Sequence, residues 1–127
     1  MNRLLYGVTS RGTASSVIGG SVSGMEAVGK TGTTTDNKDY TYVGLTPYYV
    51  TSVWWGYDTP YDMTWANSSE RGRSTQKAWK ALMERVQEGL EPKSFPLSEN
   101  VVKATYCTVS GDLATSLCAS TATGYYT

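Results

Sequence analysis

The chain has 127 residues, with 11 basic and 11 acidic side chains, no histidine and two cysteines. This length supports at most one domain with a sizeable core and is short for an enzyme with a covered cleft. Balanced charge gives no indication of nucleic-acid or anionic-membrane binding, and a structural zinc site of four Cys/His ligands is excluded. No metal or other cofactor is indicated by this composition.

The N-terminal part begins with a predicted helix and continues into a segment of small residues. Residues 2–9 favour a short helix with Leu4, Leu5 and Val8 on one side. Residues 12–27 are rich in Gly, Ser and Ala and predict a loop or a loose helix. The start of the chain has no apolar signal-peptide region, and no run approaches the roughly 20 apolar residues of a membrane span.

Three strand candidates follow: Val28 to Thr33, Tyr40 to Leu45, and Tyr48 to Trp55. The DNKD tetrapeptide at residues 36–39 predicts a turn, because Asp and Asn bond to their own backbone. Both faces of the third strand are largely apolar, so we expect it to be covered on both sides. One helix cannot cover both faces, which indicates that part of the covering structure lies outside these residues.

One amphipathic helix is predicted from Ser74 to about Glu88, with Ser74 as its N-cap, after a polar loop over residues 57–73. Its apolar stripe recurs at helical spacing and comprises Trp79, Leu82, Met83, Val86 and Leu90.

The Ser/Thr-rich tail predicts a possible short hairpin. Val101 to Val109 favours a strand, residues 110–112 a turn and Leu113 to Leu117 a short return, whereas the last residues are expected to be poorly ordered. Cys107 and Cys118 are compatible both with a disulfide that closes a short loop and with two free thiols.

The stretch KTGT at residues 30–33 carries the chemistry of the sequence. Lys30 supplies a point charge, threonine hydroxyls donate hydrogen bonds to a carboxylate, and Gly32 leaves room for a substrate backbone along the strand. The backbone N–H after the glycine is free to face a developing oxyanion. Composition alone predicts about 0.09 occurrences of K-T-G, and roughly 0.002 with two further threonines.

The segment GKTGTTTDNKDYTYVGLTPYYVTSVWWGYD, residues 29–58, resembles the third motif region of the penicillin-binding proteins. The similarity is to the transpeptidase domain of the bifunctional class A type, in which Asn usually stands at the position of Thr35. Gly12-Thr13-Ala14 resembles the family's GTA, residues 76–90 resemble its C-terminal helix, and VSGDLAT…C resembles the tail that often follows. The resemblance covers roughly residues 3–118.

This resemblance implies an α+β fold, in which an antiparallel sheet contributes three of the family's five strands and packs against a C-terminal helix. It places the C-terminal part of a transpeptidase domain at residues 1–93 and a tail at residues 94–127. The implied activity is that of a serine D,D-transpeptidase that crosslinks peptidoglycan stem peptides through an acyl-serine and binds beta-lactams. The implied location is the bacterial cell envelope, outside the cytoplasm, with an anchor in another part of the parent.

The resemblance also assigns roles to the motif. Lys30 would stabilise negative charge and help to relay a proton, and Thr31 and Thr33 would bind the carboxylate. The N–H of Thr33 would form half of the oxyanion hole, and Gly32 would allow close approach. The family's S-x-x-K and S-x-N motifs lie upstream, so we expect this chain to be inactive alone. The expected partners are a stem peptide or beta-lactam in the parent, the missing N-terminal half of the domain, and a second copy.

Two alternatives are a non-catalytic extracytoplasmic module that binds peptide or glycan, and part of a serine beta-lactamase. Ser74–Lys77 and Ser98–Asn100 match S-x-x-K and S-x-N, but composition predicts about 0.7 and 0.4 such matches by chance. Ser74 is better explained as a helix cap.

Other residues have simpler interpretations than catalysis. Nine of the 15 aromatic residues lie between residues 40 and 65 and are expected in the core more than on a glycan-stacking face. We expect Arg71 and Arg73 in a solvated loop, and turn formation for Asp36 and Asp39 in place of acid–base catalysis. Cys118 has no histidine to activate it as a nucleophile.

Overall fold

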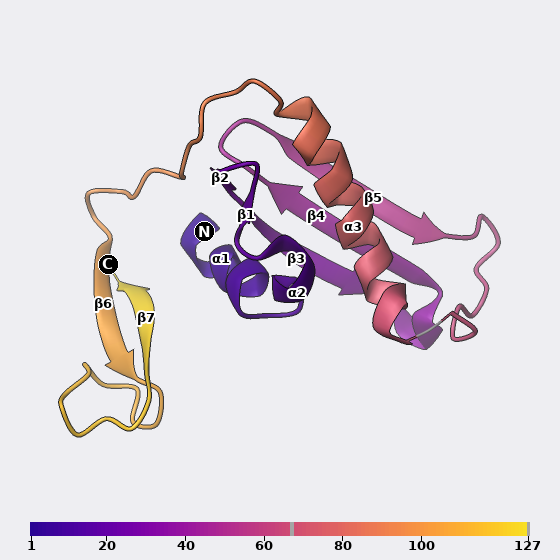
Figure 1. Ribbon diagram of the computed structural model, residues 1–127. Helices are drawn as coiled ribbons and strands as arrows, with labels where there is room; N and C mark the ends of the chain where they lie inside the picture. Colours follow the sequence, from indigo (N-terminus) through magenta and orange to yellow (C-terminus); the bar gives the residue numbers. More distant parts are fainter. Residues whose placement is uncertain (67, 127) are drawn as a thin grey trace. The chain divides into compact units, whose positions relative to one another are not determined.

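The computed structural model describes residues 1–66 and 68–126, and the chain divides into two compact units, Met1–Phe95 and Pro96–Thr127. The elements of the first unit are α1 (Asn2–Ser10), α2 (Ser15–Ile18), β1 (Ser21–Val22), β2 (Met25–Glu26), β3 (Val28–Thr33), the 3-10 turn η1 (Thr35–Asn37), β4 (Asp39–Leu45), β5 (Val50–Gly56) and α3 (Ser68–Val86) (Figure 1). The assignment of residues 1–93 and 94–127 as domain and tail stays a prediction.

The centre of the first unit is an antiparallel sheet in the order β3-β4-β5. Its register places Lys30 opposite Val43, and Gly32 opposite Thr41, which faces Trp54 in turn. The predicted α+β class and the three predicted strands are confirmed, with β5 beginning two residues later than expected. The difference arises because Pro47 and the residues after it form the connection, in which the N–H of Thr46 bonds to the carbonyl of Tyr49.

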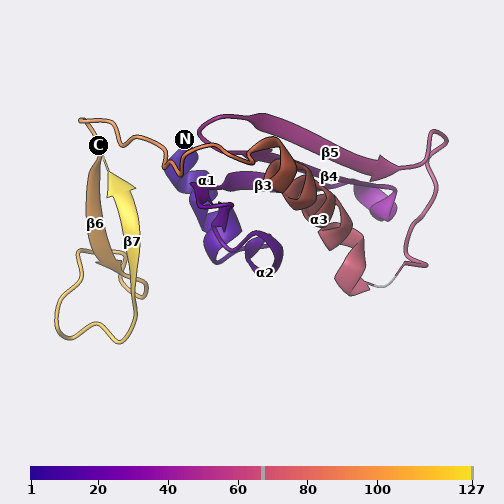
Figure 2. The same ribbon diagram turned by 45° about the horizontal axis from the view of Figure 1, so that its top comes forward.

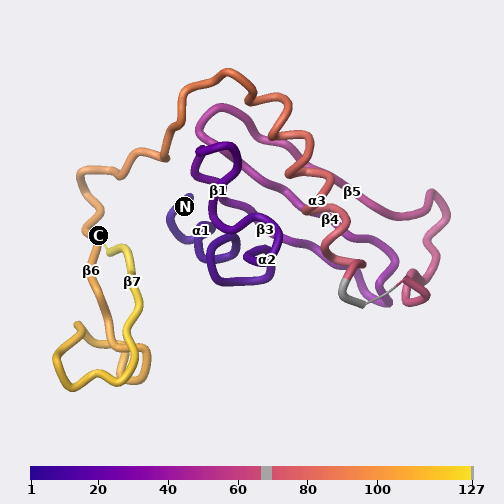
Figure 3. Tube along the Cα trace, viewed as in Figure 1, coloured from indigo at the N-terminus to yellow at the C-terminus, as the bar shows by residue number. Residues whose placement is uncertain are grey.

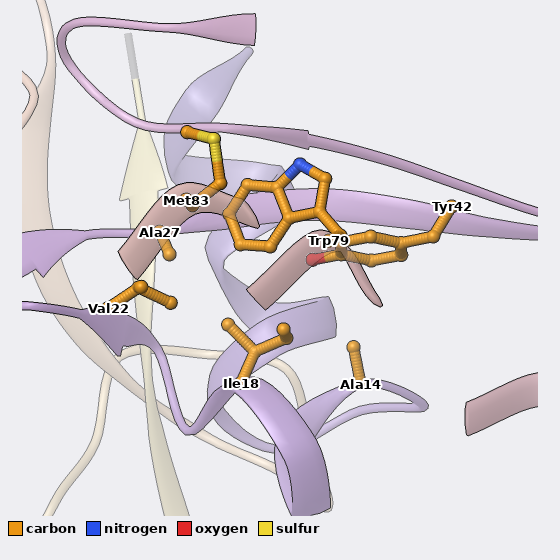
Figure 4. Packing of buried hydrophobic residues seen from close by; sticks show 7 residues of the cluster. All are labelled: Ala14, Ile18, Val22, Ala27, Tyr42, Trp79 and Met83. Carbon is orange, nitrogen blue, oxygen red and sulfur yellow. The ribbon is translucent and has the colours of Figure 1, made fainter. Parts of the chain in front are cut away.

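Helices α2 and α3 lie on the same face of this sheet (Figure 2). Trp79 of α3 is fully buried, meets the ring of Tyr42 edge-on at 5.3 Å between centroids, and donates from Nε1 to the carbonyl of Thr51 at 3.1 Å. Burial of aromatic rings of this size is a dominant contribution to core stability. The core cluster comprises Ala14, Ile18, Val22, Ala27, Tyr42, Trp79 and Met83 (Figure 4).

The opposite face of the sheet is largely exposed along β5 and at Val43 in the described part of the chain. Val50 is 67% exposed and Trp54 53% exposed, and Val43 of the neighbouring strand shares this face. Thr51, Val53 and Trp55, which point the other way, are half-buried. The expectation that both faces of the third strand are covered is therefore wrong for these residues, because the one long helix packs on the other side.

The first thirty residues contain a hairpin that sequence analysis missed. Helix α1 forms as predicted, although Leu4 is 70% exposed and only Val8 of its apolar residues packs against the core cluster. Strands β1 and β2 pair through a two-residue turn at Ser23 and Gly24, both with positive φ. A Ser-Gly pair between two apolar residues is a signal for such a turn that the composition of this segment concealed.

Helix α3 begins at Ser68, six residues before the predicted start. Ser74 is not an N-cap but lies inside the helix, where its hydroxyl donates to the carbonyl of Glu70 at 2.9 Å. Arg71 and Arg73 also lie in the helix and not in a loop. The first two turns carry no apolar stripe, so hydrophobic periodicity could not reveal them.

The chain after α3 is fastened to the N-terminal elements through a cluster around Glu26. Arg3 forms an ion pair with Glu26 and donates to the carbonyl of Phe95 at 2.6 Å. Glu26 accepts from the N–H of Phe95 at 2.8 Å, and its own N–H bonds to the carbonyl of Lys93. These contacts keep residues 93–95 within the first unit.

The second unit is an antiparallel hairpin of β6 (Val102–Cys107) and β7 (Thr121–Tyr126), joined by a long loop (Figure 3). The expectation that the last residues are poorly ordered is wrong, because residues 121–126 complete this hairpin. The predicted return at Leu113 to Leu117 is also not a strand, since only Leu113 makes an isolated bridge, to Tyr106. Leu113 and Leu117 are exposed and offer no core that would favour a third strand.

The close packing of Trp79 on β4 gives a first prediction. A Cβ at Gly44 would overlap the indole ring of Trp79, so Gly44→Ala should lower the free energy of unfolding by about 1–3 kcal/mol. Gly72→Ala is the matched control, because nothing lies within 4 Å of its Cβ position inside α3. It should raise stability by up to about 1 kcal/mol. Denaturant unfolding of both variants checks this, and equal effects would contradict the packing described.

Candidate functional site

The KTGT stretch forms the exposed end of β3, the edge strand of the sheet. Val28 and Gly29 are buried, whereas the strand becomes accessible from Lys30 onward. Successive side chains of a strand point to opposite faces. Lys30 and Gly32 therefore share the uncovered face with Val43, and Thr31 and Thr33 point to the other.

The backbone brings the motif together at the edge of the strand. The N–H of Thr34 donates to the carbonyl of Asp39 at 3.1 Å. Because inward and outward groups alternate along a strand, the N–H and carbonyl groups of Thr31 and Thr33 point away from β4. Lys30 Nζ donates to the carbonyl of Thr31 at 2.8 Å. The lysine ammonium and the outward Thr33 N–H thus border the same open edge.

The segment between α1 and α2 flanks this edge and contributes a second hydroxyl. The hydroxyl of Thr13 lies 3.1 Å from that of Thr31. Ala14 is fully buried in the core, and a Cβ at Gly12 would approach the backbone of Val8 within 2.9 Å. These two neighbours fix the position of Thr13. Gly12-Thr13-Ala14 resembles the GTA motif of the penicillin-binding proteins, but no sequence pattern indicates that Thr13 contacts Thr31.

The glycines of β3 differ in what the fold requires of them. A Cβ at Gly29 would overlap the hydroxyl and ring of Tyr42, so this position needs glycine for packing. A Cβ at Gly32 would meet only Thr41, with its nearest atom at 3.6 Å, which is ordinary van der Waals contact. Nothing within the described chain therefore requires a glycine at residue 32.

The turn after β3 is held by its own polar side chains. Thr34 and Asp39 exchange two hydrogen bonds, at 2.8 and 3.1 Å, and Trp54 Nε1 donates to Asp39 at 3.1 Å. Asp36 adopts φ 60° and pairs with Lys38 at 3.5 Å. The two carboxylates thus have the turn-forming roles that the sequence favoured over acid–base catalysis.

The S-x-x-K match at Ser74–Lys77 and the S-x-N match at Ser98–Asn100 take part in local structure. Beyond the Ser74 bond inside α3, Lys77 pairs with Glu70 at 2.5 Å. Hydrogen bonding from the Lys77 ammonium, together with its charge, lowers the pKa of Glu70. Ser98 accepts from the N–H of Asn100 at 3.4 Å in a turn of the second unit. Neither serine is arranged with a base as a nucleophile requires.

Many of the aromatic residues lie on the surface and not in the core. Tyr40 and Tyr42 are buried, as expected. The expectation of a core position is wrong for the more exposed members, which are Tyr48, Tyr49, Trp54, Tyr57, Tyr61 and Trp65. The sequence could not distinguish these groups, because alternation along β5 was apolar on both sides.

Neither a metal centre nor a membrane span is found in the part of the chain that the structure describes. Among residues 1–66 and 68–126, no three His, Cys, Asp or Glu side chains gather in a way that could hold a metal ion. No helix in these ranges has both the length and the apolar character needed to cross a bilayer.

Comparison with known proteins gives a consistent set of relatives. Penicillin-binding protein 1A of Clostridium perfringens is 39% identical over 90 residues, which is 71% of this chain and 10% of the relative. The proteins of that name from Clostridium tetani and Neisseria gonorrhoeae are 36% identical over 100 residues and 33% over 104, covering 75% and 82% of this chain and 12% of each relative. No protein-family model matches the chain.

The chain belongs to the penicillin-binding protein family. Its residues correspond to part of the transpeptidase domain of the class A members. The crystal structure of penicillin-binding protein 1A from Haemophilus influenzae supports the fold, with a TM-score of 0.74 at 20% identity over 98% of this chain and 19% of that one. The chain spans about a tenth of the length of the relatives that it matches. The α+β class and partial transpeptidase fold expected of the penicillin-binding family are thus confirmed.

The turn beside the site gives a second prediction. Asp39→Ala removes the acceptor of the Thr34 hydroxyl and of the Trp54 indole N–H. The free energy of unfolding should fall by about 1–2 kcal/mol, and Trp54 emission should shift. Asp58→Ala, at an exposed position, is the control and should stay within about 0.5 kcal/mol. Denaturant unfolding followed by tryptophan fluorescence measures both, and equal losses would contradict the role of Asp39.

Proposed function

We propose that this chain supplies the carboxylate- and oxyanion-binding wall of a serine D,D-transpeptidase that crosslinks peptidoglycan stem peptides. The observation that carries the proposal is the open edge of β3, where the Lys30 ammonium and the outward N–H of Thr33 lie on an accessible strand. A cation and a fixed N–H at such an edge suit a ligand that carries a carboxylate and develops negative charge.

Each residue of the motif has a separate part in this reaction. Lys30 stabilises negative charge beside the nucleophile and helps to relay its proton. The hydroxyls of Thr31 and Thr33 bind the carboxylate of the stem peptide or of a beta-lactam. The N–H of Thr33 donates to the oxyanion, and a second donor must come from the residue that attacks.

The free space at Gly32 supports the approach of a ligand along the strand. The fold itself does not require glycine there, whereas it does at Gly29. An extended peptide that adds to a sheet edge needs the strand's backbone to be reachable. We therefore assign Gly32 to the ligand and Gly29 to the core.

The chain acts as part of a larger site. Its partners are the residues that carry the nucleophile, and its place is the bacterial cell envelope, outside the cytoplasm. The uncovered sheet face around Val43, Val50 and Trp54 supports an additional covering structure, whether the remainder of the domain or a second copy. The reading frame upstream of Met1 should encode S-x-x-K and S-x-N, and its sequence would test this directly.

The missing nucleophile gives a third prediction. The 127-residue chain, incubated with a fluorescent penicillin and separated under denaturing conditions, should carry no covalent label. Acyl transfer needs a serine beside a base, and Ser74 is bonded within its helix. A label that disappears in Ser74→Ala would contradict the proposal. Reversible binding of a muropeptide without acylation would favour the non-catalytic module.

The two glycines of β3 give a fourth prediction, which is tested in the protein as the bacterium produces it, together with the residues that carry the nucleophile. Gly32→Ala should leave the unfolding transition nearly unchanged but slow acylation by a fluorescent penicillin by about tenfold or more, because a methyl group enters the ligand's path. Gly29→Ala should instead lower stability by about 1–3 kcal/mol through Tyr42. Unchanged acylation in a folded Gly32→Ala protein would refute the assignment of Gly32.

A further inference from the structure

The second unit lacks the hydrophobic core that holds the first one together. Within residues 96–126, Cys107 is the only buried side chain, at 7% exposure. The larger apolar residues of its loops, Val109, Leu113 and Leu117, are 81%, 71% and 93% exposed. Units of this size usually depend on disulfides, metals or association for their stability. The described residues offer no metal-ligand cluster, whereas the unit contains two free cysteines.

The backbone around Cys107 holds its sulfur in a fixed polar setting. Its N–H donates to the carbonyl of Asp112 at 2.8 Å, and its carbonyl accepts from Gly111 at 2.9 Å, which folds the loop over the end of β6. The pKa of Cys107 is lowered to about 7, chiefly by the backbone N–H groups of Ser110 and Val109 and then by the Cys118 side chain.

The loop returns the segment that carries Cys118 to the end of β6, because the N–H of Thr108 donates to the carbonyl of Ser120 at 3.1 Å. The Cys118 sulfur accepts from the N–H of Thr115 at 3.3 Å, and the N–H of Cys118 donates to the carbonyl of Thr115 at 3.1 Å. Cys118 is half-exposed, whereas Cys107 is buried. Both are free thiols in this structure, and Cys118 is the more accessible of the two.

We infer that Cys107 and Cys118 form a dithiol–disulfide pair that is oxidised by exchange with an external disulfide. The deprotonated sulfur of the accessible Cys118 attacks one sulfur of the donor, breaks its S–S bond and releases a first thiolate. The Cys107 thiolate then attacks the Cys118 sulfur of the mixed disulfide and expels a second thiolate. The two protons of the cysteines end on the two released thiols, and two electrons pass to the donor.

Oxidation would change the stability of this unit more than its shape. A bond between residues 107 and 118 closes the segment that carries the exposed Val109, Leu113 and Leu117. Cross-linking restricts the unfolded chain and any locally opened state that must separate the two ends. The pair would thus set how readily this loop opens to proteases, independently of the proposed acyl-transfer site.

The test uses the whole chain with oxidised glutathione as the disulfide donor. After acid quenching and alkylation of free thiols, intact mass should show the loss of two hydrogen atoms, no alkyl group and no retained glutathione. Cleavage within residues 108–117 by a protease should then slow by at least about tenfold relative to the reduced chain. Two alkyl groups, two retained glutathiones or disulfide-linked dimers would each overturn the inference.

Two comparisons separate the role of the fold from mere proximity in sequence. In Cys107→Ser the resolving thiol is absent, so Cys118 should retain one glutathione. In Cys118→Ser the buried Cys107 should acquire glutathione at least about tenfold more slowly. In the unmodified chain, attack of the second cysteine on the mixed disulfide should also be at least about tenfold faster in the folded state than in concentrated guanidinium chloride. Equal rates in the two conditions would show that the structure does not position the pair.

Discussion

The contact between Trp79 and β4 determines how the first unit is organised. The absence of a side chain at Gly44 lets the indole ring lie directly on the strand, and the Nε1 bond to Thr51 extends the contact to β5. A ring that is fully buried against two strands fixes both the position and the rotation of α3. Because α3 and α2 are then on one face, much of the other face and the edge of β3 from Lys30 onward remain accessible.

That arrangement determines which groups of the KTGT motif are accessible. Alternation along β3 sends Lys30 to one face and the threonine side chains to the other, so neither face alone displays the whole motif. The edge of the strand brings the polar groups together, because the Lys30 ammonium bonds to the Thr31 carbonyl and the Thr33 N–H points outward. A ligand at the proposed site would therefore lie along the strand and approach in the plane of the sheet.

The sequence predicted the elements whose signals are local. The three strands and the amphipathic part of α3 follow from periodicity, and the turn at residues 36–39 follows from its Asp and Asn residues. The first turns of α3 were missed because Arg71 and Arg73 lie on a stretch without an apolar stripe. The burial of β5 was overestimated, because apolar side chains along a strand do not show which other element covers them. The contact between Thr13 and Thr31 depends on tertiary packing that no spacing encodes.

The two units differ in the interactions that offset the conformational entropy lost on folding. The first buries Trp79, Tyr42 and Met83 beneath a sheet, and the Arg3–Glu26 pair fastens the chain that leaves α3. The second has two strands and one buried side chain among its described residues, and an isolated hairpin is marginally stable in water. Its buried side chain is a cysteine whose pKa is lowered to about 7, chiefly by the backbone N–H groups of Ser110 and Val109 and also by the side chain of Cys118. A small hydrophobic residue would fill that position equally well in a purely structural role, but only sulfur can convert the contact into a covalent bond.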